Sequence, residues 1–241
     1  MIALALLGCA PDRDALVVLA ASSLTEAFGD LELRFEEEHP GVDVVLSFAG
    51  SQTLATQVRE GLAADVLASA DPEHARELAD QGLAEAPRPF ATHRLVLATA
   101  RDLDLARLPE VERLVVGAPE VPVGRYTEAL LDAATTRFGE PWRAEVERRI
   151  VSREPSVRQA LAKVALGEAD AAFVYATDAA TLDGVRAVSL PADLAPPTEL
   201  VHARLTHAPR PELAAAWMAA VEGAEGRRAL EARGFEPPVG P

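Results

Sequence analysis

The feature that most constrains the fold is an alternation of short apolar strands and amphipathic helices, repeated three times in the first third of the chain. Strands are predicted at residues 16–19, 42–48 and 65–68, and helices at residues 24–38, at 51–59 and from 72 onward. Right-handed crossovers between parallel strands place the three strand-to-helix corners along one edge of a sheet. The sequence therefore predicts an α/β fold with a mainly parallel sheet flanked by helices.

Serines occupy two of these corners. Ser23 precedes the first helix and is followed three residues later by Glu26, which is the pattern of a capping box, so we expect Ser23 at the N-cap. Ser51 follows Gly50 at the second corner and is expected to cap its own helix. Unpaired amides in the first turn of a helix attract anions. Each serine is therefore either a helix cap alone or a donor to a bound anion, and both interpretations stay open here.

A second group of elements fills the middle of the chain. A strand is predicted at residues 91–99, where the regular alternation of strand and helix ends. Further strands are predicted at residues 113–118, 150–152, 169–175 and 185–190. Helices are predicted up to Phe138, at residues 157–166 and from Ala176, and the chain ends with a strand at 199–206 and helices at 211–222 and 224–233. We therefore predict two lobes with a ligand cleft between them: residues 15–98 plus 199–241, and an inserted lobe at 99–198.

Composition limits the classes of partner. The chain has 241 residues, of which 49% are hydrophobic, a net charge of −15 and a pI near 4.8. These values indicate a folded protein and disfavour binding to nucleic acid or to anionic membranes. They do not exclude a small anion, because surface carboxylates are screened within about 10 Å in ordinary salt.

The single cysteine, Cys9, ends an apolar run over residues 2–9, and polar composition begins directly after it. This resembles the lipobox of bacterial lipoproteins, in which the cysteine carries the lipid after signal-peptide cleavage. Residues 1–9 are therefore interpreted as a signal or lipobox remnant, with a free cysteine as the alternative. The run is too short for a transmembrane helix, which needs about 20 residues.

Taken together, six short segments resemble the periplasmic molybdate-binding proteins of ABC importers: AASSLTEAF, SFAGSQTLATQ, ADVLASAD, VPVGRY, PSVRQAL and FVYATDA. The resemblance implies a two-lobed type II periplasmic-binding-protein fold. It implies a monomer without a cofactor that captures molybdate or tungstate and delivers it to an ABC permease. The location would be the periplasm or the outer face of the cytoplasmic membrane, with a lipid anchor at Cys9. The residues that match the family's ligand positions are Ser23, Ser51, Val123, Val157 and Tyr175, which would hold the oxyanion's oxygens and not coordinate the metal directly.

The chemistry of these five positions agrees with that assignment. Molybdate is a dianion without a proton, so its site needs donors only, namely hydroxyls and, at Val123 and Val157, backbone amides. Sulfate has the same charge and differs in size, so a binding protein for another small oxyanion such as sulfate stays an alternative. Asp178 would offer an acceptor, and we expect it to pair with a backbone amide at its own helix start. We expect Arg125 and Arg158 to face solvent or to pair with nearby acids.

An enzyme is the rival class. A serine at a strand-to-helix turn is also found in serine hydrolases, but neither Ser23 nor Ser51 lies in Gly-x-Ser-x-Gly. The phosphate-binding and dinucleotide-binding glycine motifs are absent from the sequence as well. The five histidines show no metal-ligand spacing: His39, His74, His93, His202 and His207. We therefore predict a binding protein and not an enzyme, with a serine hydrolase as the alternative.

Overall fold

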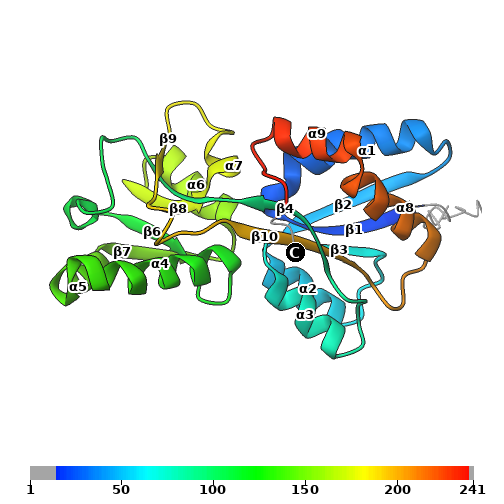
Figure 1. Ribbon diagram of the computed structural model, residues 1–241, viewed down its shortest axis with the longest axis horizontal. Coiled ribbons are helices and arrows are strands. Elements are labelled where there is room, and N and C mark those ends of the chain that lie inside the picture. Colours follow the sequence, from blue (N-terminus) through cyan, green and yellow to red (C-terminus); the bar gives the residue numbers. More distant parts are fainter. Residues whose placement is uncertain (1–14, 239–241) are drawn as a thin grey trace, which may run out of the picture.

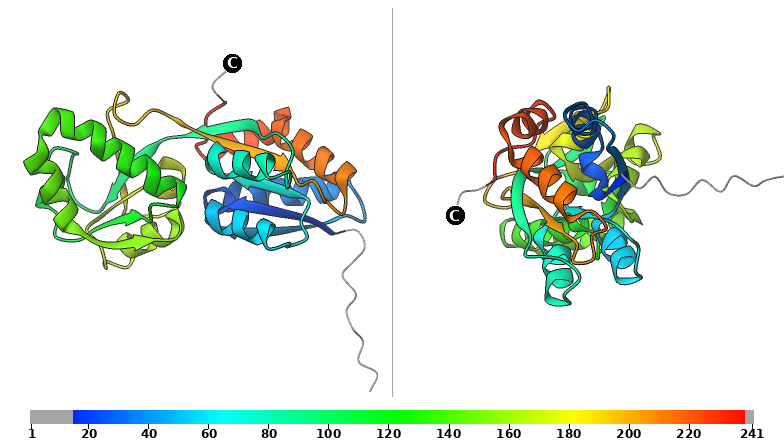
Figure 2. Two further views of the ribbon diagram at one scale, coloured as in Figure 1. Left: turned by 90° about the horizontal axis from the view of Figure 1, so that it is seen from below. Right: turned by 90° about the vertical axis from the view of Figure 1, so that its right-hand side faces the viewer.

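The computed structural model describes residues 15–238. Two α/β lobes lie side by side along the long axis, and each contains one five-stranded mixed sheet with helices on both faces (Figure 1). Figure 2 shows the lobes from two further directions, with extended segments passing between them. The predicted α/β class with two lobes is confirmed.

The sheet of the first lobe has the strand order β2-β1-β3-β10-β4. Its parallel strands are β1 (Ala15–Ala21), β2 (Asp43–Ala49) and β3 (Val66–Ser69). Strand β10 (Thr198–Arg204) runs antiparallel to β3 and to β4 (Arg88–His93). The late strand β10 thus returns to the first lobe, as the sequence predicts.

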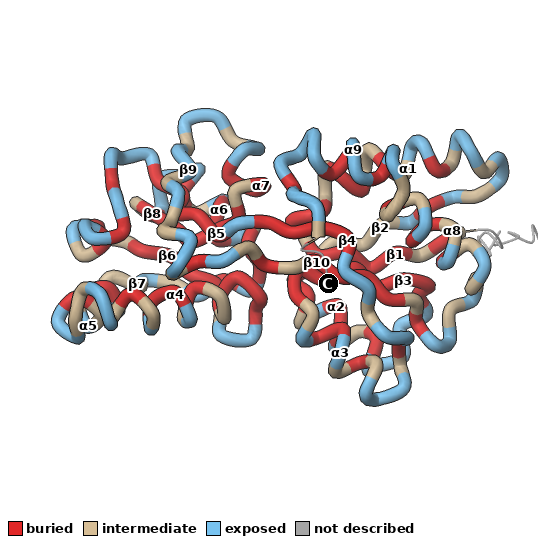
Figure 3. The backbone as a smooth tube through the Cα atoms, viewed as in Figure 1, coloured by how far each residue is buried: buried red, intermediate tan, exposed pale blue. Residues whose placement is uncertain are grey.

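Helices cover both faces of this sheet. One face carries α1 (Thr25–Glu38), α8 (Pro211–Glu222) and α9 (Ala224–Ala232), and the other carries α2 (Ser51–Arg59) and α3 (Pro72–Asp80) (Figure 1). Trp217 packs edge-on against Phe28 and Phe35, with ring centroids 5.5 and 5.3 Å apart. Buried strands therefore run through the middle of the lobe, between partly exposed helices (Figure 3).

The sheet of the second lobe has the order β7-β6-β8-β5-β9, which follows the same plan. Strands β6 (Leu114–Gly117), β7 (Ile150–Glu154) and β8 (Ala171–Tyr175) are parallel, whereas β5 (Leu95–Thr99) is antiparallel to β8 and β9 (Arg186–Ser189). The helices around it are α4 (Pro122–Phe138), α5 (Glu140–Arg149), α6 (Val157–Ala165) and α7 (Ala176–Ala179). Three parallel strands again end at one edge, and this edge faces the first lobe.

The single strand predicted at residues 91–99 is wrong. It is two strands, β4 and β5, which belong to different sheets and are separated by Arg94. The carbonyl of Arg94 accepts a hydrogen bond of 2.9 Å from Ala176 N, and its side chain pairs with Glu236. A continuous apolar run does not reveal which partner strand each half will pair with, so the sequence concealed this crossing.

Helix α5 was also missed by sequence reasoning. Gly139, at φ 87°, ends α4 in a left-handed conformation, and Pro141 lies in the first turn of the next helix. Only Trp142 and Val146 of α5 are buried, so its apolar periodicity is weak.

No helix among residues 15–238 is long and apolar enough to cross a bilayer. The predicted signal or lipobox remnant at 1–9, with Cys9, lies outside the described residues.

Two histidines in the first sheet are buried. His93 is 1% exposed, and burial lowers its pKa to about 3. The side chain of His202 lies 2.7 Å from Glu222 Oε1, and burial lowers its pKa to about 4. Both imidazoles are therefore neutral in the folded protein at pH 7.

The low pKa of His93 predicts a stability cost in acid. In the unfolded chain a histidine titrates near pH 6.5, so between pH 6.5 and 3 the unfolded state binds a proton that the folded state does not. Stability from this group is therefore lost as the pH falls, by about 2 kcal/mol between pH 6.5 and 5. Because Asp178 and other groups also titrate, we compare the wild type with His93→Phe by urea unfolding at both pH values. Between pH 6.5 and 5, the unfolding free energy of the wild type should fall by this amount relative to that of the variant. If the difference in unfolding free energy between the two proteins is the same at both pH values, a neutral, buried His93 is contradicted.

Candidate functional site

One small pocket lies where the two lobes meet, with about 220 Å³ of empty space, part of which is open to solvent. Both lobes contribute to its lining, which consists of Ala21, Ser22, Ser23, Ala49, Gly50, Ser51, Ala70, Val121, Pro122, Val123, Ser156, Val157 and Tyr175. All five residues that the sequence singled out as ligands are therefore brought together. No charged side chain is among the described residues that line the pocket.

The topology explains this convergence. The pocket residues follow the carboxyl ends of β1, β2 and β3 in the first lobe, and of β6, β7 and β8 in the second. In each sheet three parallel strands point their carboxyl ends toward the other lobe, so the corners face one another. The helix N-termini that follow these strands bring unpaired amides to the same place.

Ser23 does not cap a helix, contrary to the capping-box prediction. Residues Ser22–Leu24 form a short 3₁₀ turn, and α1 begins after it at Thr25 without a side-chain cap. Because of this turn, Glu26 does not reach back to Ser23 and instead pairs with Arg158. The Ser23 hydroxyl is buried and has no hydrogen-bond partner among the described residues. Its proton is therefore free to be donated into the pocket.

Ser51 is the first residue of α2, and the N-cap is Gly50, so the predicted cap is displaced by one residue. Its Oγ accepts a hydrogen bond of 3.1 Å from Ala70 N, at the end of β3. Since the amide takes a lone pair of the oxygen, the hydroxyl proton is left to donate elsewhere. Ala70 is a site residue that sequence reasoning missed, and only its position after a strand could have indicated it.

The second lobe supplies two helix N-termini. Val123 lies in the first turn of α4 and Val157 is the first residue of α6, whose N-cap Ser156 accepts from Gln159 N at 3.3 Å. Both valine side chains are buried, so what these residues offer is their first-turn amides. The positive ends of two helix dipoles therefore meet at the pocket.

Gly124 lets the turn before α4 pack tightly. A Cβ at this position would lie 2.0 Å from the carbonyl oxygen of Ala118. The glycine therefore allows the backbone approach that positions the Val123 amide.

Tyr175 ends β8 and is 1% exposed. Its hydroxyl has no hydrogen-bond partner among the described residues, and burial raises its pKa well above the usual 10. The phenol is therefore protonated at neutral pH and acts as a third hydroxyl donor, beside Ser23 and Ser51.

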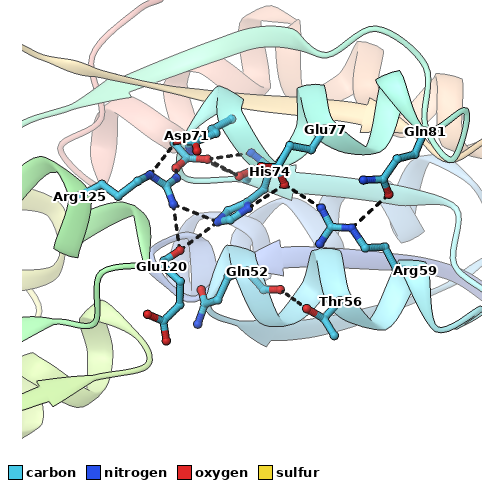
Figure 4. Close-up of polar contacts among 11 residues, drawn as sticks. Gln52, Thr56, Arg59, Asp71, His74, Glu77, Gln81, Glu120 and Arg125 are labelled. Atoms are coloured by element: carbon cyan, nitrogen blue, oxygen red, sulfur yellow. Dashed lines mark hydrogen bonds and ion pairs between the residues drawn. The ribbon is translucent and has the colours of Figure 1, made fainter.

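Arg125 lies near the pocket but is neutralised by acids of the other lobe. Its guanidinium pairs with Asp71, contacts Glu73 Oε2 at 2.9 Å and donates to the carbonyl of Glu120 at 2.9 Å. Figure 4 shows this group, in which His74 also contacts the Glu120 carbonyl, at 3.0 Å. Pairing with acids, one of the two outcomes that we expected for Arg125, is observed.

Arg158 is neutralised in the same way, on α6. It pairs with Glu26 of the first lobe and, through Nε at 2.6 Å, with Asp178 Oδ1. The prediction that Asp178 pairs with a backbone amide is wrong, because the arginine approaches it first. Asp178 is fully buried, and burial raises its pKa to about 7 against the lowering effect of Arg158. The Asp178 side chain therefore faces the guanidinium of Arg158 and is not in the pocket lining.

The lobes also touch through the backbone. Gln52 Nε2 donates to the carbonyl of Pro155 at 2.8 Å, and a Cβ on Gly50 would lie 2.4 Å from that same oxygen. Each of these interlobe contacts lies within three residues of a predicted ligand. The structure is therefore a closed form, with the contacts surrounding a pocket of neutral donors.

Such a pocket can hold a small anion that carries no proton. Hydroxyls and amides donate to every oxygen of such an anion, and no carboxylate is present to accept a proton from it. Among residues 15–238, no cluster of three histidine, cysteine, aspartate or glutamate side chains could hold a metal ion.

Comparison with known proteins agrees with the fold. Residues 16–236 match the family described as "Bacterial extracellular solute-binding protein". The molybdate-binding protein ModA of Mycobacterium tuberculosis is 37% identical, over 92% of this chain and 85% of that protein. The solved periplasmic molybdate-binding protein of Azotobacter vinelandii superposes with a TM-score of 0.79 at 22% identity, over 93% of this chain and 100% of that one. The solved sulfate-binding protein SubI of Mycobacterium tuberculosis superposes with a TM-score of 0.80 at 16% identity, over 92% of this chain and 86% of that one.

The close approach at Gly124 predicts a large stability cost for Gly124→Ala. The new Cβ would meet the backbone of Ala118, which has no free rotamer to move away, so the unfolding free energy should fall by at least about 2 kcal/mol. Gly29→Ala, in the middle of α1 with nothing within 4 Å of its Cβ, is the matched control and should be neutral or slightly stabilising. Chemical denaturation of both variants measures this, and equal stabilities would contradict it.

Proposed function

The chain belongs to the bacterial extracellular solute-binding proteins, and on this basis we propose that it captures molybdate between its lobes. The observation that carries the proposal is the neutral, donor-only pocket, in which three hydroxyls and the amides of two helix N-termini converge. The ligands proposed are Ser23, Ser51 and Tyr175 through their hydroxyls, and Val123 and Val157 through their amides. Hydrogen bonds to a charged group contribute about 1.5–3 kcal/mol each, so a dissociation constant between micromolar and nanomolar is expected.

Tungstate has the same charge and shape, and it is proposed as a second ligand of the same site. Sulfate is the alternative, because it is also a dianion without a proton. The greater sequence identity to ModA than to the sulfate-binding protein favours molybdate. Hydrogen phosphate is disfavoured, since a carboxylate is the strongest acceptor for its proton and none is among the described residues that line the pocket.

A serine hydrolase finds no support in the pocket. The hydrogen bond of Ser51 Oγ comes from the Ala70 amide and not from a base, and Ser23 Oγ has no hydrogen-bond partner among residues 15–238, so neither serine is activated as a nucleophile. We propose a binding protein that uses no cofactor and catalyses no reaction.

We propose that the protein delivers its ligand to an ABC permease outside the cytoplasm and acts there as a monomer; its membership of the bacterial extracellular solute-binding proteins supports this. We propose further that Cys9 anchors it to the membrane through a lipid. Mass spectrometry of the protein purified from its own membrane measures the modification, and an unmodified Cys9 would contradict the anchor.

Hinge motion between the lobes is proposed to open the pocket. The sequence predicts residues 15–98 with 199–241 as the first lobe and 99–198 as the second. Because β5 (Leu95–Thr99) pairs in the second sheet, we propose that the first crossing lies at Arg94. We propose that the lobes open before release, because contacts between them lie directly beside the ligand residues.

A calorimetric ligand panel tests the proposed function. Molybdate and tungstate should bind at micromolar concentration or below, and sulfate at least 100-fold more weakly. Tighter binding of sulfate would support the alternative, and binding of none of these anions would overturn the proposal.

Val157→Pro should remove one donor without disturbing the fold. Position 157 is the first residue of α6, where proline is well tolerated, and Ser156 before it is already extended. Loss of the amide should lower the affinity for molybdate at least 10-fold. The control Val157→Ala keeps the amide, so its affinity for molybdate should stay within about 3-fold of the wild-type value. Equal affinities of both variants by calorimetry would exclude the amide as a ligand.

Gly50→Ala should hold the lobes apart. Its Cβ would meet the carbonyl of Pro155 across the cleft, and the φ of −64° is acceptable for alanine, so the open form is not strained. We expect at least a 10-fold loss of molybdate affinity with an unchanged melting temperature of the ligand-free protein. Gly29→Ala is again the control, and wild-type affinity in Gly50→Ala would contradict closure at this point.

A further inference from the structure

We propose that His93 is a positioning residue that aims the Tyr175 hydroxyl at the bound anion. This inference rests on the proposed function, because it assigns a role within the same site. The observation behind it is a ring contact between the two lobes, made by a residue that is not one of the five proposed ligands.

His93 is the last residue of β4, directly before the crossing at Arg94. Its ring stacks on that of Tyr175, with centroids 3.5 Å apart and planes inclined by 20°. Phe235 lies near the same imidazole, at 6.1 Å between centroids. A side chain of the first sheet therefore supports a ligand residue of the second.

The Tyr175 hydroxyl has no polar partner that orients it among the described residues, so the direction of the O–H depends on how the ring is packed. The hydroxyl lies at the far end of a long side chain, and a small rotation of the ring displaces it from the anion. Binding groups must be held to within about 0.5 Å by their surroundings, and the His93 face provides this restraint.

The imidazole also approaches the backbone of Ala70. Burial lowers the pKa of His93, and the contact with this backbone raises it by a smaller amount. The amide of Ala70 donates to Ser51 Oγ at 3.1 Å. His93 thus contacts one proposed hydroxyl donor, Tyr175, and Ala70, whose amide supports another, Ser51.

What His93 contributes is its aromatic face and not its ring nitrogens. Neither ring nitrogen makes a well-formed hydrogen bond among the described residues, and burying unpaired polar atoms costs free energy that a phenyl ring would avoid. The imidazole is neutral at pH 7, so it adds no charge to a neutral pocket and acts through its position. Because the stack lies beside Arg94, where the chain crosses between lobes, hinge motion should disturb it least.

A double-mutant cycle tests this role. Molybdate dissociation constants are measured by calorimetry at pH 7.5 for the wild type, His93→Ala, Tyr175→Phe and the double variant. We expect His93→Ala to weaken binding at least 10-fold, and the double variant to bind within 2-fold of Tyr175→Phe. His93→Phe, which restores an aromatic face, should bind within about 3-fold of the wild type.

His202→Ala is the matched control. His202 is also a buried histidine of the first sheet, but it packs on Phe90, with centroids 4.9 Å apart, and is not in the pocket lining. The variant His202→Ala should have a lower melting temperature than the wild type, and its molybdate dissociation constant should stay within 2-fold of the wild-type value. If His93→Ala does not fold, His93→Leu replaces it, since leucine fills the space without an aromatic face.

Two results would overturn the positioning role while leaving the proposed function intact. One is wild-type affinity in His93→Ala or His93→Leu. The other is an equal loss from the histidine substitution with and without the Tyr175 hydroxyl. If the wild type binds no tetrahedral oxyanion, the proposed function fails first, and the positioning role falls with it.

Discussion

The rest of the structure depends on one constraint: unpaired hydrogen-bond donors from two lobes must meet at a single point without a charge between them. Three hydroxyls and two helix N-termini do so at the carboxyl ends of five strands. A dianion without a proton satisfies such donors, whereas an anion that carries a proton leaves one of its own donors unpaired. The proposed ligand class thus rests on the hydrogen-bonding capacity of the pocket.

Charge is present near the pocket but is already paired. Arg125 and Arg158 each reach acids of the first lobe, and Arg158 also neutralises the buried Asp178. These pairs, with the contact of Gln52 to Pro155, connect the lobes directly beside the ligand residues. The same contacts that keep the pocket electrically neutral therefore also close it, which links selectivity to the motion of the lobes.

Much of this arrangement could be predicted from the sequence, because local signals agree with the global fold. The strand-to-helix corners at Ser51 and Val157, and the late return of β10, follow from periodicity and turn residues. What could not be predicted depends on partners distant in the sequence. The 3₁₀ turn that frees the Ser23 hydroxyl, the split at Arg94 and the pairing of Asp178 with Arg158 are each decided by packing between segments. The stack of His93 on Tyr175 joins two sheets, and no local pattern indicates it.

A crystal structure of the protein with molybdate, in which the anomalous scattering of molybdenum locates the anion, tests the central claim most directly. The account predicts the anion between the lobes, with its oxygens within about 3 Å of the Ser23, Ser51 and Tyr175 hydroxyls and of the Val123 and Val157 amides. Arg125 and Arg158 should keep their acidic partners. An anion held by either arginine, or bound outside this pocket, would contradict the account.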